Sequence, residues 1–151
     1  MTCLKMFSGR SKTWVLNLPL RIISVAALSP ATVLYEENYP KTIGFSTNYL
    51  FSEPNDLDER KKVSPIEYVD SNCPPTVLFA GGEDPLVLCD SSKLLYEKLI
   101  ANGVKASLVL SENAGHSFEK LSPDKEPTFS FGEIQEKLVD FVTRNLPDED
   151  K

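Results

Sequence analysis

The chain has 151 residues, of which 41% are hydrophobic and 25% are charged, a composition typical of one globular domain. Its formal net charge of −6 and its pI of about 4.8 disfavour binding to phosphate backbones, so we expect no nucleic-acid partner. The cysteines Cys3, Cys73 and Cys89 form no C-x-x-C pair, which argues against a zinc site and against a disulfide framework.

The N-terminal stretch is similar to a secretory signal peptide only in part. Residues 1–20 form a poorly defined segment, in which Lys5, Arg10 and Lys12 precede apolar residues. Arg21, however, lies within the apolar stretch, where the core of a signal peptide is uncharged. Free thiols also fit a reducing compartment, so we expect a cytoplasmic protein. No run reaches the roughly 18 apolar residues that a membrane span needs.

The first regular element is expected just after this segment. Residues 21–30, RIISVAALSP, are nearly all apolar and rich in β-branched side chains, which predicts a buried strand that ends at Ser29-Pro30. Residues 31–70 are rich in polar and aromatic side chains and contain three prolines. We expect short helices and loops there, as an insertion within a domain that spans residues 21–146.

Two strands and a helix are expected next. TVLFAGG, residues 76–82, predicts a buried strand, because paired prolines precede it and paired glycines end it. A helix should follow, with Asp90 or Ser91 as its N-cap and Asn102-Gly103 at its end. Its apolar stripe comprises Leu94, Leu95, Leu99 and Ile100. KASLVLS, residues 105–111, predicts the third strand.

A C-terminal helix completes the pattern. Ser130 and Glu133 have the spacing of a capping box, and the helix they open has one apolar side. That side carries Ile134, Leu138, Phe141 and Val142. Residues 147–151 are expected to form a solvated acidic tail. Alternating strands and helices predict an α/β fold with a parallel sheet and crossover helices.

Two polar residues follow neighbouring strands of this predicted sheet. Asp84 lies just after residues 76–82, and His116, the one histidine in the chain, lies in the loop after residues 105–111. Parallel strands are about 4.8 Å apart, so both loops should leave the same edge of the sheet side by side. A carboxylate that orients an imidazole is the acid and base part of a nucleophilic triad.

These stretches resemble the C-terminal part of an α/β-hydrolase, close to the acetyl esterase, feruloyl esterase and hormone-sensitive-lipase-like groups. AGGEDPLV, residues 80–87, resembles the family's H-G-x-x-D-x-x-V stretch, and AGHSF, residues 114–118, its G-H-x-F stretch. The resemblance covers roughly residues 20–145 and implies that Asp84 and His116 are the catalytic acid and base. Ala80 departs from the family's histidine, at a position that is not catalytic there.

The resemblance also shows what the sequence lacks. The family's serine nucleophile sits in a G-x-S-x-G elbow, and no such motif occurs in these 151 residues, nor does the H-G-G oxyanion loop. By family comparison the front half of the sheet is missing, and residues 31–70 correspond to a cap-like insertion. The resemblance implies an ester hydrolase with a small-molecule ester substrate and with neither a metal nor an organic cofactor. We expect the isolated chain to be inactive.

Several alternatives stay open. The chain could be a non-catalytic remnant that associates with itself or a partner chain through an exposed sheet edge. Asp84 could be a turn residue before Pro85, and His116 could be structural. Cys89 could be a substitute nucleophile, although a plain small hydrophobic residue fits it better. Five aromatic residues could line a substrate pocket, with core packing favoured: Tyr35, Tyr39, Phe45, Tyr49 and Phe51.

Overall fold

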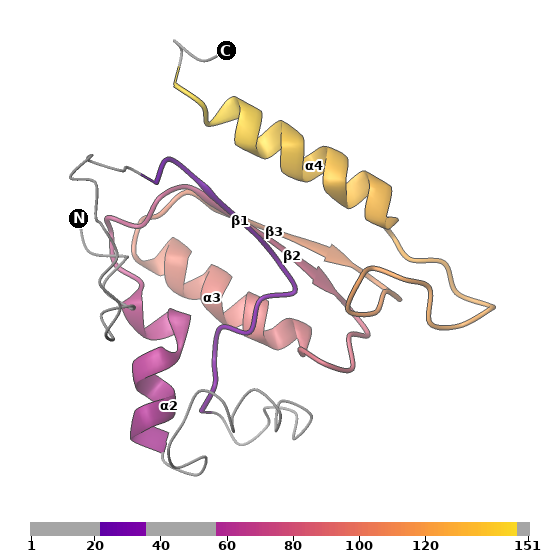
Figure 1. Ribbon diagram of the computed structural model, residues 1–151, viewed down its shortest axis with the longest axis horizontal. Coiled ribbons are helices and arrows are strands. Elements are labelled where there is room, and N and C mark those ends of the chain that lie inside the picture. Colours follow the sequence, from indigo (N-terminus) through magenta and orange to yellow (C-terminus); the bar gives the residue numbers. More distant parts are fainter. Residues whose placement is uncertain (1–21, 36–56, 148–151) are drawn as a thin grey trace, which may run out of the picture.

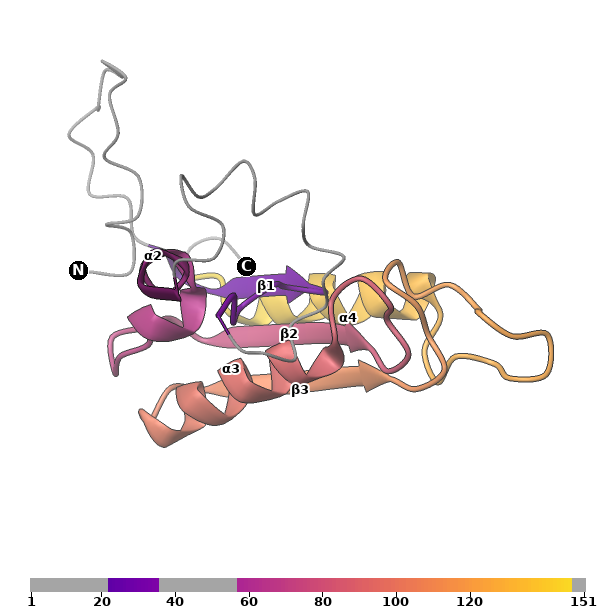
Figure 2. The ribbon, with the colours of Figure 1, turned by 90° about the horizontal axis from the view of Figure 1, so that it is seen from below.

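A three-stranded parallel sheet forms the centre of the computed structural model, which describes residues 22–35 and 57–147 (Figure 1). The strands follow the order β1-β2-β3 and comprise β1 (Val25–Leu28), β2 (Thr76–Gly81) and β3 (Ala106–Ser111). The helix α3 (Cys89–Ala101) covers one face and α4 (Phe131–Arg144) the opposite face (Figure 2). The short helices α2 (Leu57–Val63) and η2 (Pro65–Tyr68) follow the undescribed residues 36–56. The predicted α/β fold is confirmed.

The central strand β2 divides the core into two clusters. Every residue of β2 is buried, because helices cover both faces and strands pair with both edges. Leu78 packs towards α3, in a cluster that includes Leu95 and Leu99. Val77 and Phe79 point to the opposite face, in a cluster that also contains Phe118 and Ile134. The continuous apolar run of residues 76–82 is therefore a buried strand, as predicted.

The first strand is shorter and less buried than the sequence predicted. The structure has a strand only at Val25–Leu28, and its residues are half-buried or exposed. Within the part of the chain that the structure describes, β1 pairs with β2 alone. An edge strand of this kind has fewer neighbours than β2, which explains the lower burial.

The predicted side-chain cap of α3 is wrong. The helix begins at Cys89 after Leu88, which makes no side-chain cap hydrogen bond. The Asp90 carboxylate instead binds Lys93 at 2.9 Å, and the buried Ser91 Oγ accepts from the backbone N of Thr32 at 2.8 Å. The Ser91 hydroxyl, which the sequence predicted as a possible helix cap, is thus used in a tertiary hydrogen bond with Thr32.

The rest of α3 follows the predicted pattern with one exception. Leu95 and Leu99 are buried, whereas Ile100 is 47% exposed and so does not belong to the packed stripe. The chain leaves the helix through Asn102 and Gly103, as predicted. Gly103 has a φ of 76°, in the left-handed region that favours glycine after a helix.

The helix α4 starts with the predicted capping box. Ser130 Oγ accepts from the backbone N of Glu133, while the Glu133 carboxylate accepts from the backbone N of Ser130 at 2.8 Å. The hydrogen bonds that Ser130 N and Ser130 Oγ donate to the Glu133 carboxylate lower the pKa of that carboxyl below its ordinary value. Ile134, one turn into the helix, is fully buried against the sheet and fixes how α4 lies on it.

Some predictions fall on residues that the structure does not describe: the segment 1–20, the acidic tail beyond residue 147, and the aromatic residues Tyr39, Phe45, Tyr49 and Phe51. Tyr35 is described. It packs against the cluster around Leu78, and its hydroxyl donates to Glu67, so core packing fits it. Across the described ranges, no helix combines the length and the apolar character that crossing a membrane requires.

Candidate active site

The acid loop, residues 82–88, leaves the carboxyl end of β2 and holds Asp84 rigidly. Asp84 Oδ1 accepts from the backbone N of Leu86 at 2.8 Å and of Val87 at 2.9 Å. The Asp84 side chain is only 1% exposed. Asp84 therefore does form a turn, as the alternative interpretation supposed, but that turn uses one carboxylate oxygen and leaves Oδ2 available.

The histidine loop, residues 114–120, is a tight turn that follows β3. Its base is an isolated antiparallel bridge between Ala114 and Lys120, with Gly115 N donating to Glu119 O at 2.9 Å. The Glu119 carboxylate closes the turn by accepting from Ser117 N at 2.7 Å. Phe118 is 3% exposed and packs into the core. The loop is thus fixed at its base, and His116 lies at its tip.

These two loops bring Asp84 and His116 together. His116 Nδ1 lies 2.8 Å from Asp84 Oδ2, across 32 residues of sequence. A carboxylate only accepts, so Nδ1 carries the proton and Nε2 is left as the basic nitrogen. The His116 side chain is 38% exposed, whereas that of Asp84 is buried. A buried acid that orients a half-exposed imidazole can serve proton transfer to a group placed at Nε2.

Close backbone approach makes this pairing possible, and sequence analysis did not identify the residue responsible. A Cβ on Gly81 would lie 2.2 Å from Gly115 O and 2.6 Å from Ala114 O. Just beyond this contact, Glu83 N donates to Ala114 O at 3.0 Å. A glycine at the end of a strand indicates that another part of the backbone can approach closely. The spacing of residues in the sequence does not indicate which loop does so.

A second residue that sequence analysis treated only as a strand terminator also reaches this site. Ser29 follows β1, and its Oγ donates to the backbone O of His116 at 2.8 Å. The thiol of Cys89, by contrast, bonds within its own helix, where its Sγ lies 3.8 Å from Asp90 Oδ1. No group of His, Cys, Asp or Glu in the described part of the chain is arranged to hold a metal ion.

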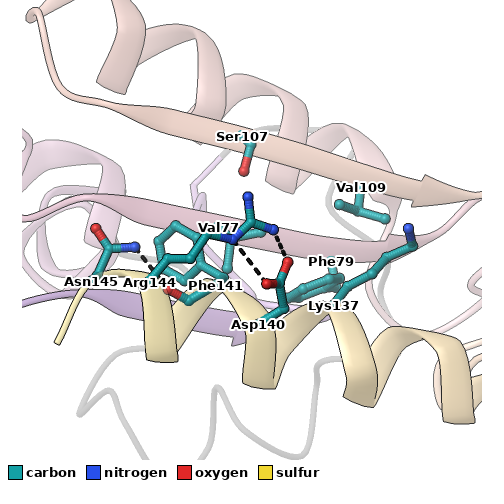
Figure 3. Close-up of a pocket in the computed structure, with 9 residues that line it drawn as sticks. All are labelled: Val77, Phe79, Ser107, Val109, Lys137, Asp140, Phe141, Arg144 and Asn145. Carbon is teal, nitrogen blue, oxygen red and sulfur yellow. Dashed lines mark hydrogen bonds and ion pairs between the residues drawn. The ribbon is translucent and has the colours of Figure 1, made fainter. Parts of the chain in front are cut away.

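A cavity of about 320 Å³ lies elsewhere, between α4 and the β2 and β3 strands (Figure 3). Phe79 and Val109 line it from the sheet, and Lys137 and Arg144 line it from α4. Arg144 forms an ion pair with Asp140 on the same helix, as Figure 3 shows. None of its lining residues belongs to the acid loop or the histidine loop, so it is separate from the Asp84–His116 pair.

One family model and one curated relative match much of this chain. The model of the BD-FAE family matches residues 22–99, which is more than half of the chain. A methylphloroacetophenone synthase from Cladonia uncialis is 28% identical over 115 residues, which cover 74% of this chain and 4% of the synthase.

Solved structures of similar fold include two esterases. Esterase 2 of Thermogutta terrifontis, phosphoramylated by tabun, aligns with 24% identity and a TM-score of 0.58 over 80% of this chain. A truncated carbohydrate esterase from gut microbiota aligns with 20% identity and a TM-score of 0.64 over 82% of this chain. This chain spans 40% and 42% of the length of those two proteins.

Proposed function

We propose a function from one premise: the chain belongs to the BD-FAE family, an α/β-hydrolase-type family. The proposed reaction is hydrolysis of a small carboxylic ester through an acyl-enzyme. His116 acts first as general base towards a nucleophile and then as general acid towards the leaving alcohol. Asp84 orients the imidazole and stabilises its protonated form. The observation that carries this proposal is the 2.8 Å contact between His116 Nδ1 and the buried Asp84 carboxylate.

The nucleophile is the part of this reaction that the chain does not supply in recognisable form. The sequence contains no G-x-S-x-G elbow. The serine and the oxyanion hole then come from residues other than these 151, on the same or another polypeptide. The chain alone is then the acid and base part of a triad, and full activity requires the serine-bearing part.

The test is hydrolysis of p-nitrophenyl acetate by the affinity-tagged chain, purified from its native host so that any polypeptide supplying the serine is retained. We expect His116→Ala to lower kcat/KM by about a hundredfold or more, because general-base catalysis is lost. Ser117→Ala is the matched control, since this exposed neighbour contributes only its backbone N to the loop. It should keep the wild-type rate.

A fluorophosphonate probe applied to the same sample identifies the nucleophile. Labelling of a serine, together with turnover that depends on His116, would support the hydrolase and name the missing residue. An unlabelled sample with the same hydrolysis rate in wild type and His116→Ala would contradict it. That outcome would favour the second candidate, which is a non-catalytic chain that associates through its sheet edge.

The observation behind this second candidate is the edge of β1. Within residues 22–35 and 57–147 no strand pairs with the outer edge of β1, and Leu28 on that strand is 39% exposed. Association with a second copy would cover this edge. Sedimentation should then show a concentration-dependent dimer that Leu28→Lys weakens, whereas Val139→Lys, on the exposed side of α4, does not. A monodisperse monomer at high concentration would contradict association.

A further inference from the structure

Ser29 joins the end of β1 to the backbone of His116. Its Oγ donates to the His116 carbonyl oxygen at 2.8 Å, across 87 residues of sequence, and Ser29 is only 8% exposed. The hydroxyl therefore has little access to water and its hydrogen bond is made within the protein. His116 is consequently held at two points: its ring by Asp84, and its carbonyl by Ser29.

The backbone at Ser29 is shaped for this contact. Ser29 has a φ of 42°, in the left-handed region that residues other than glycine rarely adopt. Its own N donates to Phe79 O at 2.8 Å, which ties it to β2. Three residues later, Thr32 N donates to Ser91 Oγ on α3 at 2.8 Å. A strained conformation persists only where surrounding contacts fix it, and here they do so on both sides of the serine.

The hydrogen bond from Ser29 matters because it holds the histidine loop at its tip. Several of the loop's other hydrogen bonds are internal to the turn, such as Phe118 N to Gly115 O at 3.1 Å. The acid loop reaches its base, where Glu83 N donates to Ala114 O. At the tip, the Ser29 hydroxyl restrains the peptide that follows the His116 Cα. Holding this carbonyl in place holds the His116 main chain, from which the imidazole extends to Asp84.

We propose that Ser29 is a positioning residue, whose hydrogen bond to the His116 carbonyl keeps Nδ1 directed at Asp84. Its importance for catalysis rests on the proposed function, but the positioning itself does not. Because His116 is the single histidine of the chain, its ring signals in an NMR spectrum need no assignment against other histidines. The rate at which the Nδ1 proton exchanges with water measures how often the pair with Asp84 opens.

Two substitutions remove the hydroxyl in different backbone contexts. Ser29→Ala keeps the strained φ, whereas Ser29→Gly relieves it, because glycine adopts this region readily. If the hydroxyl positions His116, the Nδ1 proton should exchange about fivefold faster in both variants, the effect of losing one ordinary hydrogen bond. If strain alone mattered, Ser29→Gly would behave like the wild type. Wild-type exchange in either variant would overturn the proposal.

Ser64→Ala separates positioning from general loss of stability. Ser64 is fully buried, and its Oγ donates to Arg60 O at 2.8 Å and accepts from Leu34 N at 3.0 Å, so the substitution removes buried serine hydrogen bonds away from the site. We expect Ser64→Ala to lower the free energy of unfolding in urea about as much as the Ser29 variants do. The exchange rate of the His116 Nδ1 proton should nevertheless stay at the wild-type value. Equal acceleration in Ser64→Ala would assign the effect to stability and overturn the proposal. Absence of ester hydrolysis would contradict the proposed function. The exchange measurement would still test whether Ser29 positions His116.

Discussion

Asp84→Asn is expected to reverse the tautomer of His116 while leaving the acid loop in place. In the wild type, Asp84 Oδ1 accepts from the N atoms of Leu86 and Val87, and Oδ2 faces His116 Nδ1. Asparagine has a single side-chain oxygen, and the two backbone donors should hold it on their side. The amide NH₂ then faces Nδ1. Because Nδ1 must now accept, the proton moves to Nε2, and the ring loses its basic nitrogen.

This substitution has the largest expected effect on activity. In the proposed hydrolase, with its serine-bearing part present, kcat should fall on the order of ten-thousandfold, the magnitude that a wrong histidine tautomer produces in a serine protease. The ¹⁵N chemical shifts of the single imidazole report the tautomer directly, even in the absence of turnover. Asp90→Asn is the matched control, because Asp90 is exposed and bonds Lys93 rather than His116. A retained Nδ1–H tautomer in Asp84→Asn would show that Asp84 does not set the proton position.

The pairing of Asp84 and His116 could be predicted because it depends on strand order and strand ends. Two apolar runs with clear boundaries gave β2 and β3, which pair directly in parallel. The carboxyl ends of neighbouring parallel strands lie at one edge of the sheet, so polar residues just beyond them meet. The capping box of α4 was equally accessible, since Ser130 and Glu133 interact within one helical turn.

The contacts that refine this site could not be predicted, because each joins segments far apart in the chain. Ser29 forms a hydrogen bond with His116, 87 residues away in the sequence. Ser91, predicted as a possible cap, instead accepts from Thr32, 59 residues away. Local sequence says which groups can form hydrogen bonds, but tertiary packing decides which partner is nearest. The half-buried state of β1 has the same origin, since burial depends on what lies beside a strand.

Gly81→Ala is expected to separate the two loops that carry Asp84 and His116. The added Cβ would meet two backbone carbonyl oxygens of the histidine loop, Gly115 O at 2.2 Å and Ala114 O at 2.6 Å. Backbone atoms cannot rotate aside as a side chain can, so the loop must retreat by about 1 Å to restore van der Waals contact. The hydrogen bonds that cross this gap, Glu83 to Ala114 and Asp84 to His116, cannot all keep their lengths.

Two readouts follow from that displacement. The free energy of unfolding in urea should fall by about 3 kcal/mol, the upper end for overpacking, and the low-field Nδ1 proton signal of His116 should disappear. Gly132→Ala, within α4, is the matched control, because apart from its chain neighbours and its own helix backbone the added Cβ would meet only Ser130 Oγ, at 3.9 Å. It should preserve the signal and stabilise the chain by up to about 1 kcal/mol. If Gly81→Ala kept both its stability and the Nδ1 proton signal, residue 81 would have room for a Cβ. The absence of a side chain at Gly81 would then not be what lets the histidine loop pack against β2.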